Sequence, residues 1–175
     1  MADDDEDEGD VYEEFKKDIR LVDEFASLVL RGHYVLERDI DRIIRYIFFH
    51  PERILGEPFV FNFDRKLRLA RAMSRNASEH PHWDVVIALN ALRNTIAHHG
   101  YEDRQVKIER LRELCSKTAK LEKHEKEHGS GYMEVVTFAF ALGTAFLAHI
   151  EEDLENLRQN IDGLIAAAQE SGQPD

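Results

Sequence analysis

The sequence is short of cysteine, of positive charge and of long apolar runs. Cys115 is the only cysteine, so no disulfide can form within the chain and a reducing compartment is expected. Lysine and arginine number 23 against 35 aspartates and glutamates, which argues against binding nucleic acid over a broad basic face. The most apolar stretch, 135–150, is shorter than the ~20 residues of a membrane-spanning helix. The acidic N-terminus lacks a signal-peptide pattern, and we expect a cytoplasmic protein without a membrane segment.

At 175 residues, the chain is long enough to form a single domain with a substantial hydrophobic core. Its net charge of −12 is uneven, because residues 1–10 hold seven acids and no base, which leaves −5 on the remaining 165. We expect a disordered acidic tail over residues 1–10, one helical domain over residues 11–170 and a flexible C-terminus over residues 171–175. The tail is interpreted as a solubilising leader, with occupation of a basic cleft as the alternative.

Apolar residues recur every three or four positions, the spacing of helices with one apolar face. The pattern predicts six helical segments, over residues 11–29, 35–49, 64–74, 81–99, 106–128 and 132–168. Gly32 and His149 mark expected interruptions, Pro51 ends the second segment, and Asn62 or Asp64 is expected to cap the third. No strand alternation and no internal repeat is present. The sequence therefore predicts an all-α protein, an up-down bundle of five or six helices.

The end of the segment 81–99 carries the side chains best suited to chemistry. It reads RNTIAHHG over residues 93–100. Arginine presents a fork of donors that fits phosphate, and histidine exchanges protons near neutral pH. Asn94 and His98 are four residues apart and share a helix face, so Asn94 is expected to orient His98. A purely structural alternative stays open: Arg93 would pair with an acid such as Glu37 or Asp84, and the histidines would satisfy the last helix carbonyls.

Arg93 followed by Asn94, with His98 or alternatively His99 downstream, resembles the motif of the HEPN superfamily of small helical domains. The layout of residues 20–100 is similar to that of the mannitol operon repressor family. The resemblance implies a metal-independent endoribonuclease of the toxin or defence type, working as a homodimer on an RNA substrate. Arg93 would hold phosphate, His98 would carry protons and Asn94 would orient it. The other function that it implies is a catalytically inactive regulator or scaffold that acts through protein contacts, and an antitoxin or regulatory protein is the expected partner.

The segment 64–74 is expected to expose a basic cluster. Arg65, Lys66 and Arg68 are the candidate RNA contacts in it. The alternative is a solvated helix face without a binding role.

Residues 124–128 spell HEKEH, which matches the zinc-protease pattern H-E-x-x-H. Both intervening positions and the flanks are charged, and no strand precedes the segment, so we expect an exposed charged helix end rather than a zinc site. The chain has no glycine-rich phosphate loop. The sequence predicts neither a metal nor a cofactor.

Overall fold

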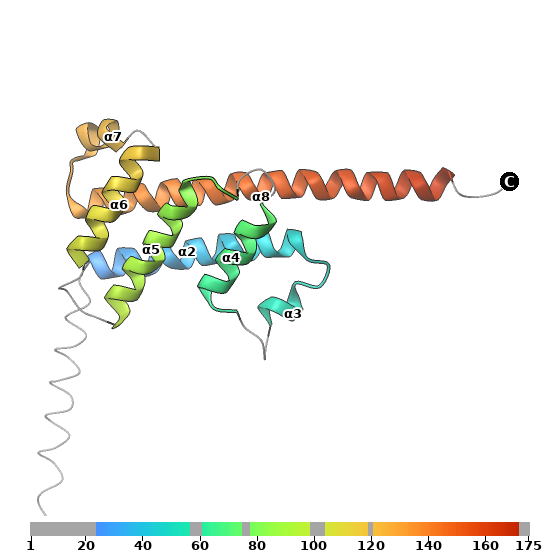
Figure 1. The fold of residues 1–175 in the computed structure, drawn as a ribbon, viewed down its shortest axis with the longest axis horizontal. Coiled ribbons are helices and arrows are strands. Elements are labelled where there is room, and N and C mark those ends of the chain that lie inside the picture. Colours follow the sequence, from blue (N-terminus) through green and yellow to red (C-terminus); the bar gives the residue numbers. More distant parts are fainter. Residues whose placement is uncertain (1–23, 57–60, 75–77, 99–103, 119–120, 172–175) are drawn as a thin grey trace, which may run out of the picture.

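The computed structural model describes residues 24–56, 61–74, 78–98, 104–118 and 121–171, and these ranges contain helices without any strand (Figure 1). The helices are α2 (Glu24–Ile47), α3 (Glu52–Leu55), α4 (Phe63–Met73), α5 (His82–His98), α6 (Arg104–Thr118), α7 (Leu121–His128) and α8 (Tyr132–Ser171). The predicted all-α bundle is confirmed. The expected acidic tail and residues 172–175 lie outside the described residues, so the tail stays a prediction.

The longest helices, α2 and α8, lie side by side and run in the same direction (Figure 1). A Cβ added at Gly32 would lie 2.7 Å from ring atoms of Phe140, so the glycine allows the two helices to approach closely. Gly143 of α8 faces Leu36 of α2 in the same contact between the two helices. Both expected interruptions are wrong: α2 continues through Gly32, and α8 continues through His149. Close packing, rather than a break, explains the glycine.

Three helices cover this pair. α4 packs on α2, α5 packs on both α2 and α8, and α6 packs on α5 and α8. Trp83 of α5 is fully buried and meets the ring of Phe146 edge-on, with 5.0 Å between centroids. The predicted cap of α4 is confirmed, because the side chain of Asn62 accepts a hydrogen bond from the backbone N–H of Arg65 at 3.0 Å.

The segment 106–128 was expected to form one helix, and this expectation is wrong. α6 ends at Thr118 and α7 begins at Leu121. Arg112 forms an ion pair with Glu125, thirteen residues away. In a continuous helix these residues would lie about 20 Å apart, so the chain must turn back between them. Leu121, which the apolar spacing predicts to point inward, is buried where α7 packs on α8.

α8 agrees with the predicted segment 132–168 to within three residues, and it runs well past the apolar stretch 135–150. Over Tyr132–Gln169 it contains an 18-residue window with a mean hydropathy of 1.6, long and apolar enough to cross a membrane. Of that window, 44% is buried inside the bundle. The core helix of a soluble protein meets the same criterion, so length and composition alone are weak evidence for a membrane span.

Candidate functional site

Arg93 and Asn94 lie together near the end of α5. Nη1 of Arg93 donates a hydrogen bond to Oδ1 of Asn94 at 3.1 Å, with Arg93 half-buried and Asn94 exposed. Within the described ranges no carboxylate pairs with Arg93, so the alternative partners Glu37 and Asp84 do not hold it there. His98 is the last residue of α5. The side chain of His98 and all of His99 lie outside the described residues, and their role stays a prediction.

A buried histidine lies on α2, facing the same stretch of α5. His33 is 6% exposed, its ring packs on Phe63 at 4.3 Å between centroids, and its Nε2 donates to Oδ1 of Asn90 at 3.0 Å. Burial lowers the pKa of His33 below its ordinary value. The hydrogen bond to Asn90 opposes this decrease, the charge of Arg93 adds to it, and the charge of Glu37 opposes it. The charge of Arg93 therefore acts with burial to favour the neutral form of the His33 imidazole.

Sequence reasoning missed His33, because residues 31–33 were interpreted as a helix interruption. The signal was present in the spacing. His33 falls four residues after Val29 and three before Leu36, on the apolar face of α2. A histidine at such a position is most often a hydrogen-bonded core residue, and here the partner is Asn90.

The expectation that Lys66 is exposed is wrong. Lys66 is 4% exposed, and its Nζ lies 3.0 Å from Oε1 of Glu37 and 2.9 Å from Oδ1 of Asp41. Burial alone would lower the pKa of Lys66, but the hydrogen bonds and charges of Asp41 and Glu37 outweigh it, and the pKa is raised. The ammonium group is thus committed to α2 and is not available to a phosphate.

The other basic side chains on α4 are less buried than Lys66, and two of them have partners. Nε of Arg68 pairs with Oδ2 of Asp64 at 2.9 Å, and Nε of Arg71 donates to the backbone oxygen of Ser78 at 2.6 Å. Arg65 is exposed and shows no ion pair within the described ranges. Of the three candidate RNA contacts, Arg65 and Arg68 present their charges to solvent, and Lys66 does not.

The H-E-x-x-H pattern lies on α7. The rings of His124 and His128 are 4.6 Å apart, and His124 packs on Phe138 of α8 at 4.8 Å. Among the described residues, no three histidine, cysteine, aspartate or glutamate side chains are grouped as metal ligands would be. Here His124 contributes to the packing of α7 on α8.

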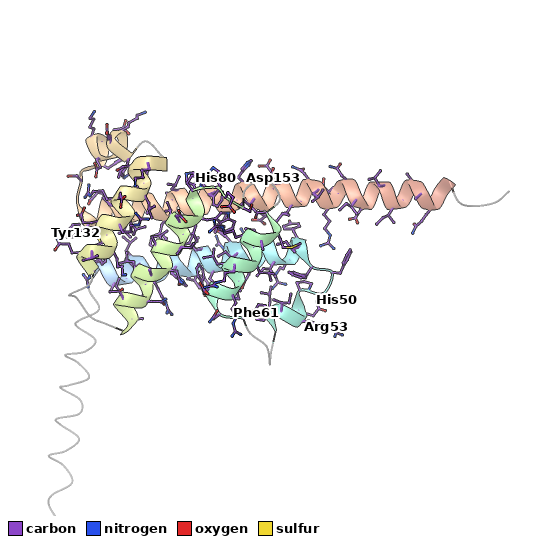
Figure 2. The ribbon with its side chains drawn as sticks, viewed as in Figure 1. His50, Arg53, Phe61, His80, Tyr132 and Asp153 are labelled. Carbon is purple, nitrogen blue, oxygen red and sulfur yellow. The ribbon has the colours of Figure 1, made fainter. Side chains whose placement is uncertain are left out.

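An apolar seam follows α8 along most of its length, and sequence reasoning did not single it out. Apolar or small residues alternate in steps of four and three, the spacing of a helix that packs along one line. The seam consists of Val136, Phe140, Gly143, Leu147, Ile150, Leu154, Leu157, Ile161, Leu164 and Ala168. Up to Ile150 it is buried in the core, whereas Leu157, Ile161 and Leu164 are exposed. Residues 154–171, here called the overhang, extend past the end of α2 (Figures 1 and 2).

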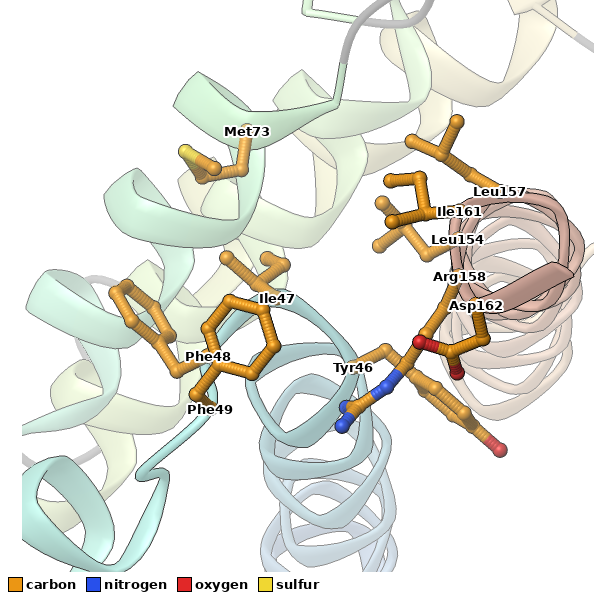
Figure 3. Close-up of a pocket in the computed structure, with 10 residues that line it drawn as sticks. All are labelled: Tyr46, Ile47, Phe48, Phe49, Met73, Leu154, Leu157, Arg158, Ile161 and Asp162. Carbon is orange, nitrogen blue, oxygen red and sulfur yellow. The ribbon is translucent and has the colours of Figure 1, made fainter. Parts of the chain in front are cut away.

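A groove of about 240 Å³ lies at the base of the overhang (Figure 3). One wall comes from the overhang, and the other comes from the end of α2, the residues after it and α4. The lining consists of Tyr46, Ile47, Phe48, Phe49, Met73, Leu154, Leu157, Arg158, Ile161 and Asp162. Phe49 is 83% exposed, and Leu164 beyond the groove is 72% exposed. Together the groove and the overhang form one apolar surface, which is typical of an interaction site.

Comparison of the chain with known protein families, with curated proteins and with solved structures gave no match. The HEPN and mannitol-repressor resemblance therefore stays an interpretation of the sequence motif.

Proposed function

We propose that this protein is a helical regulator or scaffold that acts through protein contacts, and that the overhang and the groove make those contacts. One observation carries the proposal: the seam that holds α8 in the core continues outside the core with the same spacing. Large exposed apolar side chains grouped in this way are costly in water unless a partner covers them. This function is one of the two that the resemblance implies.

Charge supports a protein partner over a nucleic acid. The chain carries −12 overall, Lys66 is buried against two carboxylates, and Arg68 is paired with Asp64. Affinity for nucleic acid comes mainly from unpaired lysine and arginine at phosphates. With Lys66 buried, the α4 cluster leaves only the exposed Arg65 and Arg68 for such contacts.

A photo-crosslinking residue at Leu164 tests this function in cells that express the full chain. Leu164 lies on the seam, and the matched control is Gln159, which is exposed on the outer face of the same overhang. We expect discrete protein adducts from position 164 and severalfold fewer from position 159. Equal labelling from both positions, or none from either, would contradict the proposal.

A metal-independent endoribonuclease is the second candidate function. It is favoured by Arg93, which is bonded to exposed Asn94 without a carboxylate partner in the described ranges. In this reaction His98, or His99, would take the proton of the 2′-hydroxyl of RNA. The 2′-oxygen would attack phosphorus, and the 5′-oxygen would leave with a proton, which gives a 2′,3′-cyclic phosphate. Arg93 would stabilise the charge on phosphate, and proton transfer of this kind contributes roughly 10²–10⁴ in rate.

Cleavage of mixed RNA in the presence of a chelator tests the second candidate. The comparison is between the wild-type protein and the Arg93→Ala/His98→Ala double variant. Cleavage by the wild type alone, with 2′,3′-cyclic phosphate ends, would establish the nuclease. Equal cleavage by both proteins, or by neither, would reject this site and leave the contact function.

A further inference from the structure

We infer that the partner at the overhang and groove is a second copy of this chain, docked antiparallel so that each overhang lies in the groove of the other copy. This inference rests on the proposed function, since it names the partner at the same surface. Its first support is that both halves of the required contact occur in one molecule. The groove presents Phe49 and Met73, and the overhang presents Leu164 and Ile165, all of them exposed.

The position of the charges allows two acidic overhangs to meet. Glu155 and Asp162 lie at matching positions on the helix, one seven-residue step apart and outside the positions that directly flank the seam, and Asp162 lies at the rim of the groove. The flanking positions from Leu154 onward are occupied by Arg158, Asn160, Ile165 and Ala167. These carry a single charge, which is positive, so pairing two copies along the seam sets no acid against an acid.

The arrangement of α2 determines the direction of docking. α2 lies alongside α8, runs in the same direction and ends where the overhang begins (Figure 1). A parallel partner would occupy the line that continues α2, and its own bundle would collide with α2 and α4. An antiparallel partner brings only the end of its overhang toward the groove. Ala167 and Ala168, small residues on the seam side of its overhang, leave room for the exposed ring of Phe49.

Antiparallel docking also gives a closed, twofold interface in which the same surface is used by both copies. Along the seam, Leu157 of one copy faces Ile161 of the other, and Leu154 faces Leu164, so the twofold axis crosses the seam at the level of residue 159 along the helix. A specific interface uses roughly 20 to 30 residues on each side. The overhang alone is smaller than this. Reciprocal docking adds the groove of each copy, so the contact between overhang and groove forms twice and the interface reaches that size.

Sedimentation of the full chain over about 1 to 100 µM tests the partner. We expect a dimer. The Ile161→Glu/Leu164→Glu variant should dissociate at least about tenfold more readily, the factor that goes with losing one buried leucine-sized contact. The matched control, Asn156→Glu/Gln159→Glu, adds the same charge on the outer face and should stay dimeric. Circular dichroism should show that the helical bundle stays folded in both variants, because all four positions are exposed. A wild type that is monomeric at all concentrations would overturn the inference, as would equal weakening by both variants.

Spin labels at Asn160→Cys and, separately, Ala167→Cys test the direction. Native Cys115 is buried, and burial raises the pKa of its thiol to about 11, so it should not react with the label. Positions 160 and 167 lie on the same side of the helix. With the twofold axis at the level of residue 159, antiparallel docking separates the two labels along the helix axis by about 3 Å at position 160 and about 24 Å at position 167. A dimer with equal distances at both positions would overturn antiparallel docking.

The two proposals fail in different ways. If the purified chain is monomeric while position 164 crosslinks to a different protein in cells, the second-copy inference is wrong and the contact function stands. If the chain is monomeric and position 164 gives no protein adduct, both are wrong. If the full chain instead floats with phosphatidylcholine vesicles through α8, lipid covers the seam and both are wrong.

Discussion

Lys66 and Arg68 lie two residues apart on α4, but their charges have different surroundings. Lys66 is buried between Glu37 and Asp41, whereas the pair of Arg68 with Asp64 is largely exposed. Removing one partner of a fully buried ion pair costs ~3–5 kcal/mol. Because these carboxylates are partly exposed, we expect Lys66→Met to lower the free energy of unfolding by about 2 kcal/mol. Arg68→Met should change it by less than about 0.5 kcal/mol. Urea unfolding of both variants measures this, and equal effects would contradict it.

The candidate site could be predicted from the sequence only in part, and Lys66 shows why. Residue type and spacing located Arg93 and Asn94, and the structure brings these side chains together. Lysine at position 66 looked like a solvated base, because its partners come from another helix, 29 and 25 residues earlier in the chain. His33 was missed for the same reason, since Asn90 lies 57 residues away. Spacing along one helix cannot show what another helix brings to it.

The buried imidazole of His33 predicts a pH dependence. Burial lowers its pKa below the ordinary value of 6.5, so at pH values under 6.5 the unfolded chain binds this proton before the folded chain does. The stability associated with neutral His33 is therefore full above pH 6.5 and falls as the pH decreases toward the folded pKa. His33→Gln keeps a donor for Asn90 but has no proton to bind. Urea unfolding between about pH 7.5 and 5.5 should show a shallower loss of stability for this variant, and identical slopes would contradict the assignment.

At the scale of the helix, Gly32 and Gly163 occupy opposite environments. A Cβ at Gly32 would lie 2.7 Å from the buried ring of Phe140, whereas a Cβ at Gly163 would meet nothing within 4 Å. Alanine is favoured over glycine in a helix by ~1 kcal/mol. We expect Gly163→Ala to stabilise the helix by up to about that amount. Gly32→Ala should destabilise the protein by about 1–3 kcal/mol through overpacking. Thermal unfolding of the two variants checks this, and stabilisation by both would mean that α2 and α8 are less tightly packed than described.

The observed helix ends agree with those predicted from the sequence where residues close in the chain determine them. The segment 81–99 matches α5 to within a residue at each end, and Asn62 caps α4 as its side chain predicts. The division between α6 and α7 did not follow, because it depends on contacts with other helices. Arg112 reaches Glu125 and the backbone oxygen of Ser130, and Leu121 is buried where α7 packs on α8. No proline interrupts residues 106–128, so the local sequence contains no stop signal there.

For the whole molecule, the forty residues of α8 span about 60 Å, longer than the helices that cover it. An isolated helix the length of the overhang is only marginally stable in water, because most helical stability comes from packing. The order of the overhang must therefore depend on what covers its seam. With a second copy as that cover, amide hydrogen exchange over residues 158–169 should slow as protein concentration rises. Exchange over residues 139–150, which the bundle buries, should not depend on concentration. In the Ile161→Glu/Leu164→Glu variant the first region should exchange rapidly at every concentration, while the second stays protected. Slow exchange of the overhang in dilute wild-type protein would mean that its helix is held without a partner.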